Sequence, residues 1–168
     1  FPKSVGQIPL YYAHKNTGRP LKEGKWFEKF RSNYLDVDND ALYPFGYGLS
    51  YTTFRFSDIT LNRSSIGMDN ELVASVTVTN TGDRAGSEVV QLYIRDLVGS
   101  VTRPVKELKG FEKIYLQPNE SRTVRFTIAP EMLKFYNADL KFVAEPGDFD
   151  VMIGPDSRNV KTARFTLR

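Results

Sequence analysis

Apolar and polar residues alternate with a period of two over most of the chain after residue 53. In the run 72–79, the even positions are Leu, Ala, Val and Val, while three of the four odd positions are Ser or Thr. This period is typical of a β-strand with one face buried and the other in solvent. The same alternation recurs in the runs 90–94, 124–128, 149–153 and 163–167, and the runs 54–61 and 108–116 complete the set.

The apolar runs are separated by short turn sequences rather than by helices. Gly and Pro with Asn or Asp mark these turns because they adopt the backbone angles that turns require. Only the run 130–135 predicts a helical turn, with Pro130 at its N-terminal position. About seven strands within residues 54–168 therefore predict an all-β fold, an antiparallel β-sandwich of the immunoglobulin or fibronectin III type. The turns fall at Gly82, Gly99, Pro118-Asn119, Pro146-Gly147 and Pro155-Asp156.

Residues 1–53 lack this periodicity and predict a mostly irregular N-terminal segment. One extended run, Ile8–Tyr12, predicts a short strand, and Gly18-Arg19-Pro20 predicts a loop after it. An unpaired strand would present free backbone donors and acceptors. We therefore expect Ile8–Tyr12 to pack on the sandwich or to pair with a neighbouring chain.

The composition narrows the classes of function. The 168 residues carry a net charge of +3, with 23 basic and 20 acidic residues interspersed. The sequence therefore lacks the cluster of basic residues that is typical of nucleic-acid-binding proteins. No apolar run reaches the length of a membrane-spanning helix. Cysteine is absent, and the single histidine, His14, lies in a polar stretch where we expect a solvated side chain. We expect no cofactor, and the start at Phe1 suggests a fragment or a processed chain without a signal peptide.

The acidic residues do not suggest a complete active site. The cluster Asp36–Asp40 resembles the start of a calcium loop, but Ala41 and Tyr47 occupy the positions of the required Gly and Glu, so we expect a solvated turn and no metal site. A glycosidase needs two carboxylates across one bond. We place most acidic residues instead on solvent faces, among them Glu88 and Asp150, or in turns.

Aromatic residues are concentrated in the first 53 positions. Such side chains stack on sugar rings, but they equally pin an irregular segment onto a neighbouring domain. Trp26 and Tyr34 lie in the most polar stretch and are our candidates for substrate binding. The group comprises Tyr11, Tyr12, Trp26, Phe27, Phe30, Tyr34, Tyr43, Phe45, Tyr47 and Tyr51.

The string Tyr43-Pro44-Phe45-Gly46-Tyr47-Gly48-Leu49-Ser50-Tyr51-Thr52-Thr53-Phe54 closely resembles the junction into the fibronectin III-like C-terminal domain of family 3 glycoside hydrolases. Four further strings fit the same pattern, and the first twenty residues resemble the end of that family's preceding α/β sandwich domain. The resemblance covers nearly the whole chain and is strongest to periplasmic bacterial β-glucosidases. The four strings are Val78–Gly82, Val89–Tyr93, Arg103–Phe111 and Glu145–Gly147.

The resemblance implies two parts, residues 1–53 as the end of the preceding domain plus a linker and residues 54–168 as the sandwich. It implies a parent enzyme that hydrolyses terminal β-D-glucosyl residues with retention, or a β-xylosidase or α-arabinofuranosidase. The family's nucleophile and acid/base lie in earlier domains, so no catalytic residue is expected here, and Asp58 lacks the family's Ser-Asp-Trp context. The implied role is an accessory domain that contacts the upstream catalytic domains, with contacts between two copies and a periplasmic or secreted location as further expectations. A carbohydrate-binding module is the alternative.

Overall fold

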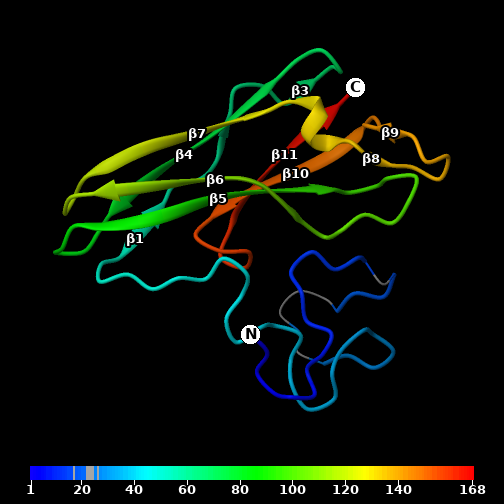
Figure 1. The fold of residues 1–168 in the computed structure, drawn as a ribbon, viewed down its shortest axis with the longest axis horizontal. Helices are drawn as coiled ribbons and strands as arrows, with labels where there is room; N and C mark the ends of the chain where they lie inside the picture. The colour runs from blue at the N-terminus through cyan, green and yellow to red at the C-terminus, as the bar shows by residue number, and fades with distance from the viewer. Residues whose placement is uncertain (17, 22–24, 26) are drawn as a thin grey trace.

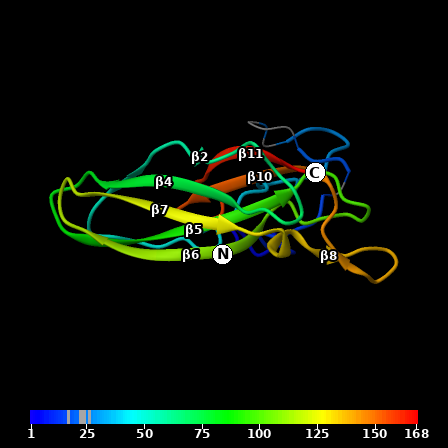
Figure 2. The same ribbon diagram turned by 90° about the horizontal axis from the view of Figure 1, so that it is seen from above.

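Two antiparallel β-sheets pack face to face, and an irregular N-terminal part lies against one end of them (Figure 1; Figure 2). The computed structural model describes residues 1–16, 18–21, 25 and 27–168. The predicted sandwich of the fibronectin III type is confirmed. We call residues 1–53 the N-terminal lobe and residues 54–168 the sandwich.

The first sheet is built around a central strand, β4 (Leu72–Asn80). Strand β7 (Ser121–Ile128) pairs with the full length of one edge of β4. Strands β1 (Phe54–Phe56) and β2 (Thr60–Leu61) pair with successive parts of the other edge. All three pairings are antiparallel.

The second sheet contains five strands in the order β3 (Ser65–Ile66), β11 (Lys161–Leu167), β10 (Gly147–Gly154), β5 (Gly86–Asp96) and β6 (Glu107–Leu116). Only β3 runs parallel to its neighbour, β11. The 3₁₀ turn η1 (Pro130–Leu133) confirms the predicted helical turn. It leads into a separate hairpin of β8 (Phe135–Tyr136) and β9 (Phe142–Val143), which projects from the sandwich (Figure 1).

The core lies between the two sheets and uses the residues that the alternation predicts. Leu72, Ala74, Val76 and Val78 of β4 are at most 1% exposed. They face the inward side chains of β5, β10 and β11, including Phe149 and Phe165, whose rings stack with centroids 5.4 Å apart. Burial of this apolar face is the main term that stabilises the sandwich.

The predicted strand 54–61 forms two short strands, because the chain turns away from β4 at Ser57–Ile59. Ser57 holds the break in place. Its backbone N–H donates to the Thr77 carbonyl oxygen at 2.9 Å, and its hydroxyl oxygen accepts from the Thr77 N–H at 2.9 Å. Asp58 at this break is exposed and lies 3.1 Å from the Lys161 ammonium, so it is a surface residue as expected.

The outer face of β5 and β10 is buried, contrary to the alternation. Gln91 and Tyr93 of β5 are 5% and 0% exposed, and Asp150 and Met152 of β10 are also buried. The expectation that Asp150 lies on a solvent face was wrong, since its carboxylate pairs with the Arg164 guanidinium at 2.8 Å. Glu88 is half-buried, and desolvation raises the pKa of its carboxyl. Coverage of this face by other parts of the chain explains these differences.

No part of the described N-terminal lobe forms a strand longer than a single bridge. The prediction of a strand at Ile8–Tyr12 was wrong, although the expectation that this run packs on the sandwich is confirmed through Tyr12. Pro9 in the middle of the run has no N–H to donate to a sheet ladder, which disfavours a strand there. Just after this run, the lobe backbone meets the sandwich at a bridge between Lys15 and Pro104 and at the His14 carbonyl oxygen, which accepts from the Val105 N–H at 2.9 Å.

Candidate functional site

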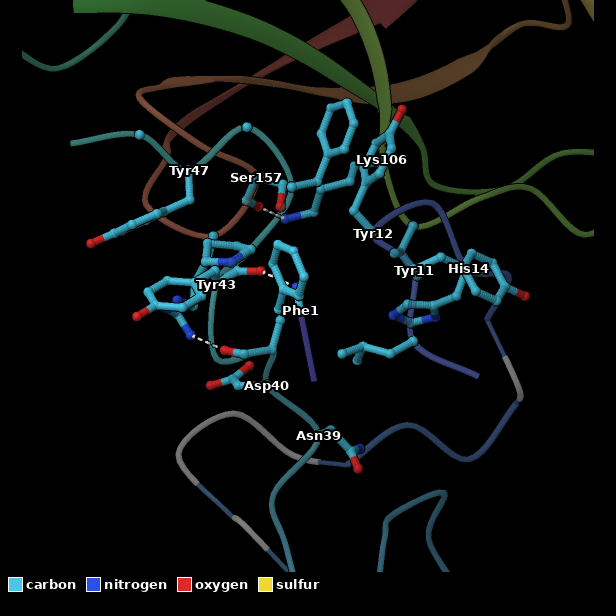
Figure 3. Close-up of a pocket in the computed structure, with 18 of the residues that line it drawn as sticks. Phe1, Tyr11, Tyr12, His14, Asn39, Asp40, Tyr43, Tyr47, Lys106 and Ser157 are labelled. Carbon is cyan, nitrogen blue, oxygen red and sulfur yellow. Dashed lines mark hydrogen bonds between the residues drawn. The ribbon is translucent and has the colours of Figure 1, made fainter. Parts of the chain in front are cut away.

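An open cleft of about 950 Å³ lies where the N-terminal lobe meets the end of the sandwich (Figure 3). Two stretches of the lobe form most of its wall, residues 10–14 and 39–49, and the sandwich adds residues 105–106 and 157–158. Phe1 and Tyr43 meet edge to face within it, with ring centroids 6.4 Å apart. The lobe therefore supplies most of the cleft lining, including six aromatic side chains.

Tyr12 and Phe45 form the contact between the cleft and the sheet below. Their rings stack with centroids 4.2 Å apart, and the Tyr12 ring also meets Tyr93 of β5 edge to face at 5.9 Å. Tyr93 is fully buried, so desolvation raises the pKa of its phenol. These rings explain why the outer face of β5 is dry.

Gly46 brings the lobe backbone into contact with Gln91. The Gln91 side-chain amide donates to the Gly46 carbonyl oxygen at 3.0 Å and also to the Pro155 carbonyl oxygen. The Gln91 side-chain oxygen accepts from the Tyr93 hydroxyl. Gly46 has a φ of +80°, and a Cβ there would lie 2.0 Å from the Gln91 side-chain oxygen. Only glycine fits this turn and this approach.

Two basic side chains tie the cleft wall together. The Lys106 ammonium donates to the Ser157 carbonyl oxygen, and burial lowers the pKa of Lys106. The Arg158 guanidinium donates to the Ala41 carbonyl oxygen at 2.9 Å, and the Ser157 N–H donates to the Phe45 carbonyl oxygen at 2.9 Å. These groups fix the β10–β11 turn against the lobe.

The cleft lacks the paired carboxylates that glycoside hydrolysis needs. Asp40 is the one carboxylate among its described lining residues. Retaining enzymes use two such groups about 5–5.5 Å apart, one as nucleophile and one as acid/base. The described residues of this cleft therefore offer binding surface but not that chemistry.

The acidic cluster at residues 36–40 is a structural turn of the lobe. Both oxygens of the Asp38 carboxylate accept from the Lys3 ammonium, at 2.6 and 2.7 Å, and one also accepts from the Asp40 N–H. The hydrogen bond from Lys3 holds the pKa of Asp38 below its usual value. Within the described parts of the chain, no three His, Asp or Glu side chains gather as metal ligands would.

The two candidate substrate-binding aromatics lie outside this cleft or outside the described residues. Tyr34 is half-buried, and its hydroxyl donates to the Pro9 carbonyl oxygen at 2.8 Å. Trp26 lies outside the described residues. His14 is exposed, as expected, although it lines the cleft edge beside Tyr11. Sugar binding by Trp26 and Tyr34 stays a prediction.

Sequence reasoning did not single out the residues that line the cleft. Tyr43, Tyr47, Lys106 and Arg158 come from three stretches of the chain that only the fold brings together. The aromatic content of residues 1–53 was the available signal, but it does not show which rings share one cleft.

The chain is similar to a known domain family and to parts of longer known proteins. Residues 88–157 match the fibronectin type III-like domain family. The chain is 56% identical over 167 residues to the periplasmic beta-glucosidase of Salmonella typhimurium, covering 99% of this chain and 22% of that protein. Residues 88–157 thus match a fibronectin type III-like domain, and nearly the whole chain is similar to one region of a β-glucosidase. The resemblance seen in the sequence is thereby confirmed.

Other relatives support the same assignment. A crystal structure of a beta-glucosidase from Listeria innocua in complex with glucose superposes with a TM-score of 0.92 at 42% identity, covering 99% of this chain and 23% of that one. A putative beta-xylosidase of Formosa agariphila is 47% identical over 167 residues, covering 99% of this chain and 21% of its own length. The chain thus spans about a fifth of the relatives it matches. Among the described residues, no helix has the length and apolar character needed to cross a bilayer.

Proposed function

We propose that this chain is the non-catalytic C-terminal accessory domain of a β-glucosidase that hydrolyses terminal non-reducing β-D-glucosyl residues with retention. The observation that carries the proposal is the 56% identity to a periplasmic beta-glucosidase over 99% of this chain but only 22% of that protein. The single carboxylate among the described cleft residues supports a non-catalytic role. The same relative supports a periplasmic or secreted location.

The partner in this proposal is the catalytic part of the same parent polypeptide. The domain would stabilise that part and set its spacing, and contacts between two copies are a further expectation. Sedimentation of the parent at several concentrations tests the contact between two copies. A monomer at every concentration would contradict that contact.

An assay of the isolated 168-residue chain on an aryl β-D-glucoside tests the proposal that this domain does not itself catalyse hydrolysis. We expect no turnover above the buffer rate, while the parent enzyme hydrolyses the same substrate. Turnover that co-purifies with the isolated chain would overturn the proposal. An Asp40→Asn variant is the matched control, because it removes the described carboxylate of the cleft and should leave that background unchanged.

A β-xylosidase is the second candidate for the parent, because the chain is also 47% identical to a putative beta-xylosidase. The two candidates differ only in the parent's substrate. Relative kcat/KM of the parent on aryl β-glucoside and aryl β-xyloside decides between them, and a preference for the xyloside would favour the second.

A further inference from the structure

The cleft between the lobe and the sandwich keeps three tyrosine rings partly open to solvent. Tyr11, Tyr43 and Tyr47 line it and are 58%, 45% and 42% exposed. Figure 3 shows Tyr43 and Tyr47 on one side of the cleft and Tyr11 with His14 on the other. The Tyr43 and Tyr47 rings are tilted by 38° with centroids 5.1 Å apart, so they do not cover each other face to face. Aromatic surface is therefore available to a ligand from both sides of the cleft.

Polar groups in the same lining are also available. The hydroxyls of Tyr11 and Tyr47 have no hydrogen-bond partner among the described residues. The Arg158 guanidinium donates one N–H to the Ala41 carbonyl oxygen, and its other N–H groups have no such partner in the described part of the chain. The cleft thus offers hydroxyls, which both donate and accept, and a guanidinium, which donates.

The mixture of rings and hydrogen-bonding groups narrows the class of ligand. A purely apolar ligand would take the Arg158 guanidinium and the tyrosine hydroxyls out of water without pairing them, which is costly. A small ion would leave the rings unused, and the charges of the lining nearly cancel, with Lys106 and Arg158 positive and Asp40 negative. A sugar has apolar C–H faces that pack on aromatic rings and hydroxyls that pair with polar groups. A saccharide therefore satisfies both parts of the lining.

The wall of the cleft is held in place by hydrogen bonds between the lobe and the sandwich. The Ser157 N–H donates to the Phe45 carbonyl oxygen at 2.9 Å, and the Gln91 side-chain amide donates to the Gly46 carbonyl oxygen at 3.0 Å. The volume of about 950 Å³ is that of a small-molecule site and leaves room for a short chain of sugars. A site that is formed before the ligand arrives lowers the entropy cost of binding.

We propose that this cleft binds a short oligosaccharide of β-linked glucosyl units, with sugar rings against Tyr11 and Tyr47 and sugar hydroxyls on Arg158. The choice of glucosyl units rests on the proposed function. The site differs from the two aromatic residues that the sequence singled out, since Tyr34 lies outside this cleft. The domain then retains a glucan chain on the parent polypeptide without cleaving it.

NMR titration of the isotope-labelled 168-residue chain with cellotetraose and with laminaritetraose tests the proposal. We expect resonances of cleft residues, among them Gly48 and Val105, to shift in a saturable way with at least one of the two. Tyr11→Ala and Tyr47→Ala should each weaken binding at least about threefold, because each removes a contact between a ring and a sugar. Tyr47→Phe keeps the ring and should retain most of the affinity. Tyr136→Ala is the matched control, since it removes a 66% exposed ring from the β8–β9 hairpin and should leave binding unchanged.

No saturable shift with either tetrasaccharide would overturn the site. An equal loss of affinity in Tyr136→Ala and Tyr47→Ala, or in Tyr47→Phe and Tyr47→Ala, would overturn the role of the cleft rings.

The parent enzyme provides the second measurement. Tyr11→Ala and Tyr47→Ala in the parent should reduce its retardation in gels that contain soluble β-glucan. Unchanged retardation would overturn the proposal, because other parts of the parent would then close the cleft. Hydrolysis of an aryl β-glucoside by the isolated chain is measured separately, so a failed saccharide site is distinguishable from a failed accessory function.

Discussion

Two residues near the junction between the lobe and the sandwich, Gly46 and Asn80, are held by contacts that tolerate few substitutions. Gly46 has a positive φ and no room for a Cβ. Asn80 is fully buried at the end of β4 and uses its whole side-chain amide. Its nitrogen donates to the carbonyl oxygens of Arg84 and Leu116, and its oxygen accepts from the Thr52 hydroxyl and the Gly82 N–H.

Gly46→Ala should destabilise the chain by about 1–3 kcal/mol, because it combines a strained φ with a clash against Gln91. Gly48→Ala is the control, since nothing lies within 4 Å of a Cβ there and its φ is not positive. Urea unfolding followed by circular dichroism measures both. Equal effects of the two substitutions would contradict the role of Gly46.

Asn80→Asp should cost at least about 2 kcal/mol, because it removes both amide donors and buries a charge with nearly the same shape. Asn62→Asp provides the comparison. Asn62 is exposed, and its side-chain oxygen accepts from the Val73 N–H at 2.9 Å, a bond that a carboxylate keeps. A loss of stability below 0.5 kcal/mol for Asn80→Asp, an order-of-magnitude threshold typical of surface changes, would be inconsistent with this network.

At the scale of elements, the lobe depends on side chains where the sandwich depends on strands. The long strands of the sandwich satisfy their backbone groups in ladders, and the alternation in the sequence marks where these strands lie. In the lobe, Gln7, Tyr34 and the Lys3–Asp38 pair link segments that are far apart in sequence. Of these three links, the Lys3–Asp38 pair is the one that acid can break.

Acid should loosen the lobe through Asp38. Since the folded-state pKa of Asp38 lies below its unfolded value, the Lys3–Asp38 pair stabilises the lobe above the unfolded pKa of about 4. This contribution is lost as the pH falls through the lower folded-state pKa. Hydrogen exchange of lobe peptides from neutral to acid pH should show protection falling over that window.

Asp38→Asn should lower the protection of the lobe at neutral pH and weaken its dependence on pH. Asp83→Asn, in an exposed turn of the sandwich, should leave the profile of the lobe unchanged. If the two variants give the same profile, the Lys3–Asp38 pair does not hold the lobe.

At the scale of the whole molecule, the lobe and the sandwich form one unit because the lobe covers part of the sheet. Gly46, Phe45 and Tyr12 of the lobe lie over Gln91 and Tyr93 and help to bury them. That residues 1–53 are the end of a preceding domain plus a linker therefore stays a prediction, and contacts join these residues to the sandwich.

Deleting residues 1–43 should lower the Tm of the sandwich without unfolding it. The deletion uncovers the Tyr93 ring, whose burial contributes on the order of 2 kcal/mol. For a domain of this size such a loss corresponds to roughly 4–8 °C. Thermal unfolding followed by circular dichroism measures the shift, with Tyr12→Ala as a smaller change in the same direction, and an unchanged Tm would show that the lobe does not support the sheet.

The sequence by itself determined the all-β class, the core faces of the long strands and the family, because a period of two and long ordered motifs are local properties of the chain. It could not determine which outward side chains are dry, since Gln91 and Asp150 occupy positions that look solvated until the lobe and Arg164 are placed over them. It also did not predict that Tyr43, Lys106 and Arg158 line one cleft. Nor did it predict that Ile8–Tyr12 lies outside the sheets. Those outcomes depend on contacts between residues far apart in the chain, which only the tertiary structure decides.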